Sequence, residues 1–164
     1  MRRIAVVVVI IGMTWTLAGD AHPASTSPGR NSVFGSGTGT LNVDGEIAPL
    51  AGTIQKGKSK KVLRLTASLG INGSPTLNGV FLRAFVNGVA FEPAVFYQQQ
   101  CNPSNGNACT VSGTFWLDLD AAEVASPGVF LGKPLNLTIE GGNPDSVGEG
   151  VLYKASFAAD LVKK

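Results

Sequence analysis

Apolar and polar residues alternate with a period of two along most of this chain, and clusters of Gly, Asn and Pro interrupt the alternation. Because successive side chains of a strand point to opposite faces, such a pattern is typical of half-buried antiparallel strands. Strands are predicted at 37–43, 47–55, 61–69, 80–86, 89–97, 110–119, 135–140 and 151–161. Seven or eight short strands predict an all-β fold, an antiparallel sandwich of the immunoglobulin-like or jelly-roll-like kind.

A β-hairpin is predicted where Asn87-Gly88 separates two alternating runs, because both residues tolerate positive φ. A two-residue turn sets the register and places Arg83 opposite Glu92, a complementary charge pair. Pro93 has no N–H to donate to a neighbouring strand, so a bulge or a sheet edge is expected there. The face predicted to enter the core carries Leu82, Ala84, Val86, Val89 and Phe91.

One short helix is predicted near 121–125. Asp120 and Glu123 have the spacing of a capping box, and Leu119 and Val124 occupy the positions of a hydrophobic staple around it. Such a helix is expected to connect two strands at one end of the sandwich.

The N-terminal segment 1–21 has the features of a secretory signal. A pair of arginines precedes an apolar run over 4–11, which is too short to span a bilayer, and small residues suit cleavage after Ala21. Residues 22–32 are then a flexible lead-in, and 33–164 form a single β-sandwich domain. We therefore expect a secreted or periplasmic protein without a membrane span once the signal is removed.

Cys101 and Cys109 are the only cysteines of the chain. The residues between them are Asn, Pro, Ser, Gly and Ala, nearly all of which favour turns. In an exported protein this arrangement predicts a disulfide that closes a loop tip, whereas a metal site would need His or further Cys nearby.

Charge and composition exclude several classes of function. Loss of Arg2, Arg3 and Asp20 with the signal leaves 11 Lys and Arg against 10 Asp and Glu, so nucleic acid is not an expected partner. His22 is the only histidine and lies beside the cleavage position, so Ser-His-Asp catalysis lacks a base. Neither a cofactor nor a metal is predicted.

Trp116 is the most distinctive residue. In the strand predicted at 110–119, alternation places Thr114, Trp116 and Asp118 on the face opposite the apolar one. A tryptophan among polar residues on an outer sheet face is typical of surfaces on which sugars stack, although a loop or a neighbouring subunit can also cover it. With Phe81, Phe85 or Tyr97 it would form an apolar patch, which marks an interaction site for a glycan or a protein. The candidate ligand-binding residues are Trp116, Thr114, Asp118, Phe81 and Phe85.

Three other groups of residues have both a chemical and a structural explanation. The carboxylates within 118–123 can serve glycoside hydrolysis, but capping explains two of them. The lysine-rich run 56–61 can attract a polyanion or an anionic surface, although solvated lysines in a hairpin turn also protect a sheet edge from aggregation. Acidic segments at 42–46 and 143–149 can bind Ca²⁺, but neither completes a calcium motif.

These observations predict an exported, non-catalytic binding or structural β-sandwich module. Carbohydrate recognition through Trp116 is the alternative, and a small carboxylate-dependent hydrolase is the second alternative. An outward Trp116 beside a shallow groove favours sugar, a deep cleft with two facing carboxylates favours the hydrolase, and a flat apolar face favours a protein partner. Asn136 begins a glycosylation sequence that matters only in a eukaryotic source.

Overall fold

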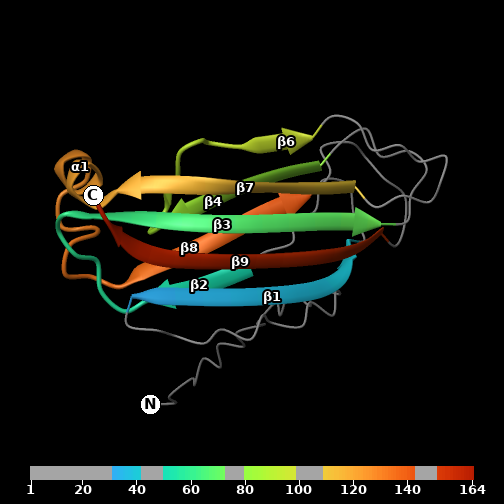
Figure 1. Ribbon diagram of the computed structural model, residues 1–164, viewed down its shortest axis with the longest axis horizontal. Coiled ribbons are helices and arrows are strands. Elements are labelled where there is room, and N and C mark those ends of the chain that lie inside the picture. The colour runs from blue at the N-terminus through green and yellow to red at the C-terminus, as the bar shows by residue number, and fades with distance from the viewer. Residues whose placement is uncertain (1–30, 42–49, 73–79, 99–108, 143–150) are drawn as a thin grey trace, which may run out of the picture.

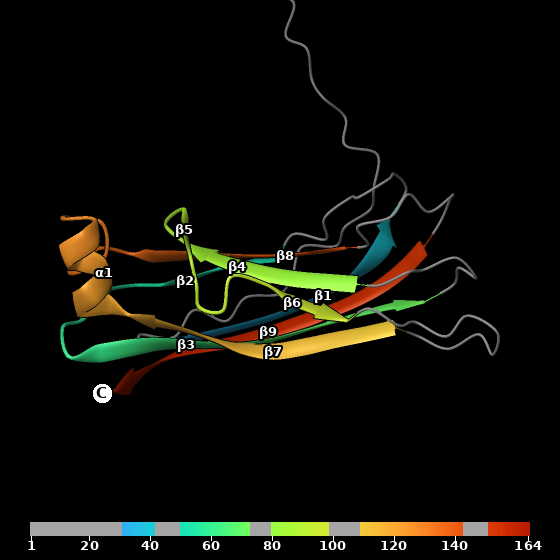
Figure 2. The same cartoon turned by 90° about the horizontal axis from the view of Figure 1, so that it is seen from above.

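The protein forms two antiparallel sheets that pack face to face, with one short helix at one end (Figures 1 and 2). The computed structural model describes residues 31–41, 50–72, 80–98, 109–142 and 151–164. The front sheet, nearest the viewer in Figure 1, has the order β1 (Ser32–Leu41), β9 (Val151–Lys163), β3 (Lys61–Asn72), β7 (Cys109–Asp118). The back sheet has the order β2 (Leu50–Ile54), β8 (Leu135–Gly142), β4 (Val80–Val86), β5 (Val89–Ala90), and β6 (Phe96–Gln98) also pairs with β4. Helix α1 spans Leu119–Ala125.

The strand order is that of a jelly roll. When β5 and β6 are counted as one interrupted strand, the first strand pairs with the last and the second with the last but one. The same nesting continues inward, because β3 pairs with β7 and β4 with β5 and β6. This pattern confirms the predicted antiparallel sandwich and selects the jelly roll from the two arrangements expected.

The alternation seen in the sequence produces the core between the sheets. Every second residue of β4 is buried, as the period of two requires. The ring of Phe115 packs edge-to-face against Phe91 and Phe96, with centroid distances of 6.3 and 4.9 Å. Phe96 lies so close to Gly113 that a Cβ there would come within 2.2 Å of the ring, so this position requires glycine.

The hairpin predicted at Asn87-Gly88 is formed, and both residues have positive φ. Beyond β5 the chain leaves β4 and crosses to the edge of the front sheet. There Glu92 N–H donates to the carbonyl of Trp116 at 3.1 Å, and Trp116 N–H donates to the carbonyl of Glu92 at 2.7 Å. The chain returns to β4 only with β6, so the strand is interrupted around Pro93, where a bulge or a sheet edge was expected.

The predicted pairing of Arg83 with Glu92 is wrong. Arg83 lies opposite Glu140 of β8, and its Nε donates to Glu140 Oε2 at 2.7 Å. The register from the hairpin turn holds only as far as the bond from Phe91 N–H to the Ala84 carbonyl, after which the chain leaves β4. Glu92 therefore contacts the front sheet instead.

Helix α1 begins at Leu119, earlier than predicted, because Asp118 is its N-cap. Asp118 Oδ1 accepts the backbone N–H groups of Asp120 at 3.0 Å and Ala121 at 3.2 Å. The hydrophobic staple is also wrong: Leu119 is buried, but Val124 remains 82% exposed. The last residue of β7 thus caps the N-terminus of the short helix.

Glu123 does not close a capping box. Its carboxylate accepts three backbone N–H groups of the segment that leads into β8, those of Gly128, Phe130 and Leu131. These bonds lower the pKa of Glu123, because each of them favours the charged carboxylate. Glu123 thereby ties α1, which follows the front sheet, to the start of a back-sheet strand.

The first strand begins at Ser32, before the predicted 37–43, and pairs with β9 along its whole length. Its sequence is rich in Gly, Ser and Thr, so propensity alone does not reveal it and pairing with a long neighbour decides its extent. The predicted signal and nearly all of the lead-in lie outside the described residues. In the part of the chain that the structure describes, no helix is long and apolar enough to cross a membrane.

Candidate binding surface

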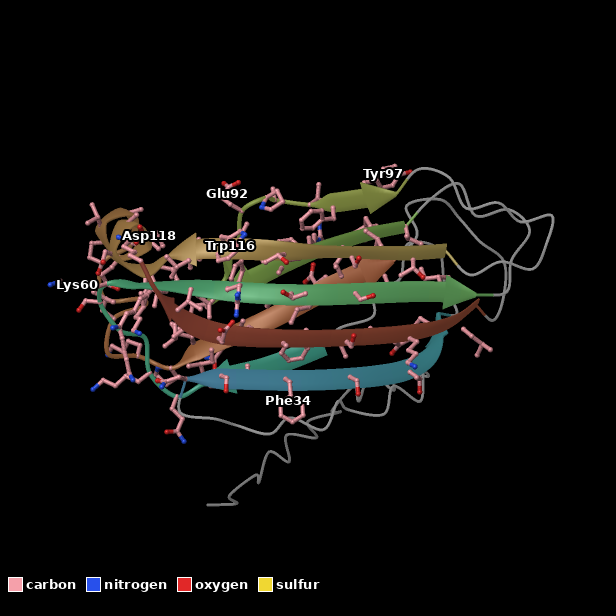
Figure 3. The ribbon with its side chains drawn as sticks, viewed as in Figure 1. Phe34, Lys60, Glu92, Tyr97, Trp116 and Asp118 are labelled. Atoms are coloured by element: carbon pink, nitrogen blue, oxygen red, sulfur yellow. The ribbon has the colours of Figure 1, made fainter. Side chains whose placement is uncertain are left out.

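Trp116 lies on the outer face of the front sheet, on its edge strand β7 (Figure 3). Its neighbour Phe115 is fully buried, whereas Trp116 is 45% exposed to solvent. Arg64 of β3 lies opposite Trp116 on one side, and Glu92 binds its backbone on the other. The indole is therefore attached to a backbone held from both sides, which reduces the ordering needed when a ligand binds.

Arg64 and Asp160 form a two-pronged ion pair beside Trp116. Arg64 Nε donates to Asp160 Oδ1 at 3.0 Å, and Nη2 donates to Oδ2 at 2.8 Å. The hydrogen bonds and the negative charge of Asp160 raise the pKa of Arg64 above its ordinary value. Two of the five guanidinium N–H groups are thus used, and the fork keeps the others in a defined orientation.

Small side chains make up the centre of this outer face. The register aligns one serine from each strand in a single row, namely Ser36, Ser156, Ser68 and Ser112. The row beside it consists of Phe34, Ala158, Thr66 and Thr114. Since neighbouring strands lie about 4.8 Å apart, these rows form a shelf of short side chains roughly 14 Å wide from β1 to β7. We call the outer face from Phe34 to Trp116 the front shelf.

Phe34 marks the margin of the front shelf opposite Trp116 (Figure 3). It lies on edge strand β1 and is 56% exposed, while its neighbour Val33 is buried. Phe34 was not anticipated from the sequence, because the strand was expected to start at Gly37. The alternation of Val33 and Phe34 was the available signal.

Thr114 and Asp118 share the outer face with Trp116, as predicted. The Thr114 hydroxyl lies 3.2 Å from that of Thr66. Asp118 receives a bond from Lys164 Nζ at 2.6 Å in addition to its capping bonds. The Lys164 hydrogen bond lowers the pKa of Asp118 most, and the helical N–H groups add to the shift. Asp118 therefore has a structural role at the end of the shelf.

Phe81 and Phe85 do not join this surface, contrary to the predicted patch. Both lie on β4 of the back sheet, on the far side of the sandwich from Trp116. The guanidinium of Arg83 lies between them, 5.7 Å from the Phe81 ring centroid and 5.6 Å from that of Phe85. Tyr97, opposite Phe81 on β6, belongs to the same outer face of the back sheet.

The lysine-rich segment has a different position from the one predicted. It is not a hairpin turn, because it links β2 of the back sheet to β3 of the front sheet. Its last residues join the end of β9 around an open depression of about 410 Å³, lined by Ser59, Lys60, Lys61, Lys163 and Lys164. Lys60 lies at the α1 end of the molecule in Figure 3. Convergence with the end of β9 was not predictable from spacing.

The other predicted chemistry gains no support. Asp120 accepts the Lys60 N–H at 2.9 Å and binds Lys164 at 3.3 Å. Among the described residues, no three His, Cys, Asp or Glu side chains are grouped so as to hold a metal ion. Cys101 and the acidic segments 42–46 and 143–149 lie outside the described residues, as does the side chain of Cys109, so the disulfide stays a prediction.

Comparison with known protein families and with curated proteins gives no function to transfer. No model of a known protein family matches the chain. No curated protein matches it significantly either. The functional assignment therefore depends on the geometry and chemistry of the front shelf.

Proposed function

We propose that the protein is an exported, non-catalytic binding module that recognises carbohydrate on the front shelf. The observation that carries the proposal is Trp116, a half-exposed indole on a fixed backbone beside the oriented guanidinium of Arg64. Small hydroxyl side chains lie next to this pair and leave the ring accessible from above.

The residue types on the shelf match the two kinds of surface that a sugar presents. The C–H face of a pyranose ring is apolar and suits the broad, rigid face of an indole. Its hydroxyls both donate and accept hydrogen bonds, as do Ser and Thr, while Arg64 supplies donors only. Because short side chains leave the shelf open, an extended glycan chain suits it better than a small molecule that must be enclosed.

The hydrolase alternative has no comparable support. Glycoside hydrolysis requires a carboxylic acid and a second carboxylate on either side of the scissile bond. In the described part of the chain, Asp118 and Asp120 bind backbone N–H groups and Lys164, and Glu123 binds three backbone N–H groups. These carboxylates hold the α1 end together. Jelly rolls occur in lectin domains and viral capsids alike, so the fold itself does not choose between functions.

Export is part of the proposal, and it carries the expectation that Cys101 and Cys109 are bonded to each other. An oxidising compartment favours this short, turn-rich loop closure. Mass spectrometry of a non-reduced digest of exported protein identifies the linked peptides. Two free thiols in that material would contradict the disulfide.

A polysaccharide-binding screen with matched aromatic variants tests the proposal. The purified protein is screened on immobilised neutral and acidic glycans, together with Trp116→Ala and Tyr97→Ala. Tyr97 is a suitable control because it is 50% exposed, much like Trp116, but lies on the back sheet. Loss of a tryptophan anchor costs roughly 2 kcal/mol, so Trp116→Ala should weaken binding about thirtyfold, whereas Tyr97→Ala should bind like the wild type.

The screen also has outcomes that reject the proposal. Binding that survives Trp116→Ala, or that is lost equally in Tyr97→Ala, would place the ligand elsewhere. Circular dichroism of both variants separates loss of binding from loss of fold. A protein that retains no glycan at all would leave the front shelf without the proposed function.

A further inference from the structure

Lysines are concentrated at one end of the molecule, where they outnumber the carboxylates of Asp118, Asp120 and Glu123. The chain has eight lysines, and Lys154 is the only one located toward the opposite end of β9. The other seven lie in the β2–β3 connection, the connection before β8 and the end of β9: Lys56, Lys58, Lys60, Lys61, Lys133, Lys163 and Lys164. We call these seven residues the lysine end.

Backbone contacts hold the lysine end in place. Gly57 N–H donates to the carbonyl of Lys133 at 2.8 Å, and Gly132 N–H donates to the carbonyl of Gly57 at 3.0 Å. A Cβ on Gly57 would come within 2.1 Å of the Phe130 carbonyl oxygen, so only glycine permits this approach. The Lys60 N–H is bound by Asp120. The lysines are therefore presented by an ordered surface.

Two features of the lysine end disfavour folding. Lys61 and Lys163 lie directly opposite each other on β3 and β9, and like charges at such positions repel. Lys60 has a φ of 55°, a conformation that costs energy for a residue with a long side chain. Among the described residues, none of these three lysines has a carboxylate partner for its side chain. Proteins break such local rules mainly at functional or strained sites.

The depression at the lysine end lies near the end of β7 that carries Trp116 and Asp118. Lys164, which lines the depression, binds Asp118, and Asp118 lies two residues from Trp116 on the same face of β7. A lysine ammonium is a compact charge with freely rotating donors, so a cluster of them suits sulfate or carboxylate groups repeated along a polymer. A glycan chain on Trp116 that extends toward α1 therefore meets Lys164 first, and Lys61 and Lys163 lie at the end of the sheet, on strand positions that alternate with the outward ones.

We infer that the ligand of the front shelf is an acidic polysaccharide, with a sugar ring stacked on Trp116 and its sulfate or carboxylate groups bound at the lysine end. This inference rests on the proposed carbohydrate-binding function and narrows it to one class of ligand. Charge complementarity favours an anionic polymer, because four of these lysines line a depression and one of them, Lys164, binds Asp118 at the end of the strand that carries Trp116.

Affinity electrophoresis with matched polymers tests the inference. The gels contain dextran sulfate or polygalacturonate, and the uncharged counterparts are dextran and methyl-esterified polygalacturonate. The wild type should bind the charged polymers at least about tenfold more tightly than the uncharged ones at low salt, and the difference should shrink as salt screens the charges.

Variants assign the effect to the lysine end. Lys61→Gln/Lys163→Gln should lose about tenfold in affinity for the charged polymers, while Lys154→Gln, an exposed lysine at the other end, should lose less than twofold. Lys60→Asn removes a charge and places a residue that tolerates positive φ, so it should weaken polymer binding while raising Tm. A variant that binds the polymers more weakly but has a higher Tm would show that Lys60 serves ligand binding and does not stabilise the fold.

The outcomes separate the two proposals. Equal binding of charged and uncharged polymers, or lysine variants that bind like the wild type, would overturn the acidic ligand. Binding of the charged polymers that is lost in Lys61→Gln/Lys163→Gln but intact in Trp116→Ala would instead overturn the front shelf as the glycan surface. Binding to phosphatidylglycerol vesicles in sedimentation, without retention by either charged polymer, would also overturn the inference.

Discussion

The outer faces of the two sheets share an arginine paired across strands with a carboxylate, yet they differ in what the neighbouring aromatic rings contact. On the back sheet, the guanidinium of Arg83 lies near the rings of both Phe81 and Phe85. On the front sheet, Arg64 is bound to Asp160, and no cation lies over Trp116 among the described residues. Partial exposure of an aromatic residue is therefore weak evidence of a binding surface. An exposed ring with no side chain of the same protein packed over it is stronger evidence.

Strand geometry explains the contrast. Phe81, Arg83 and Phe85 alternate along one strand, so the arginine necessarily lies between the two rings on one face. Arg64 has its aromatic neighbour on β7 and its carboxylate partner on β9, on opposite sides of β3. The two-pronged bond to Asp160 turns the guanidinium toward β9, and the indole remains available.

The largest expected effect contrasts a residue of the core with its neighbour on the outer face. Phe115→Ala should lower the free energy of unfolding by about 3–5 kcal/mol, because its buried ring contacts Phe91 and Phe96. Trp116→Ala, one residue away and facing outward, should cost only roughly 1 kcal/mol. Urea denaturation of the two variants measures the difference. Equal losses would make Trp116 a core residue and remove it from the front shelf.

The next effect compares the two arginines. Arg83→Ala should cost about 1–2 kcal/mol, since it loses an ion pair and two ring contacts. Arg64→Ala should cost less, because its solvent-exposed pair has no aromatic contact. Thermal unfolding at matched salt gives the order. A larger loss of stability for Arg64→Ala would show that the Arg64–Asp160 pair serves mainly to stabilise the fold and not to hold Arg64 for a ligand.

A third prediction concerns Glu123, which ties the front-sheet side to the start of β8 and so affects the relative position of both faces. Its pKa is lower in the folded state than its ordinary value of 4.5. The stabilisation is therefore complete above about pH 4.5 and is lost as the pH falls through the lowered folded value. Glu123→Gln should be less stable than the wild type at pH 7 and should lose less stability on acidification. Parallel pH profiles for the two proteins would contradict this role.

The smallest expected effect is spectroscopic and probes the front face directly. In a protein that begins at His22, the expected product of signal cleavage, Trp116 is the only tryptophan. Its partial exposure predicts red-shifted emission and ready quenching by acrylamide, and a stacked sugar should reduce the quenching. Blue-shifted, protected emission would mean that another element covers the front shelf.

Short-range signals in the sequence determined much of the architecture. The period of two predicted the strands and the outward position of Thr114 and Trp116, and Asn87-Gly88 predicted the hairpin turn. Such features depend on residues that are neighbours along the chain, so they can be recognised without knowing the partner strand. The all-β sandwich follows from the number and spacing of these elements.

Only the tertiary structure decided which distant residues meet. It paired Arg83 with Glu140, moved Glu92 to Trp116, and separated Phe81 from Trp116 by the thickness of the sandwich. It also brought Lys163 to Lys61 and aligned one serine from each front-sheet strand. These contacts depend on strand order and register, and a shift of one residue exchanges the two faces of a strand. The physical reason is that alternation specifies which side of a strand is buried, whereas packing of the whole core selects its neighbours.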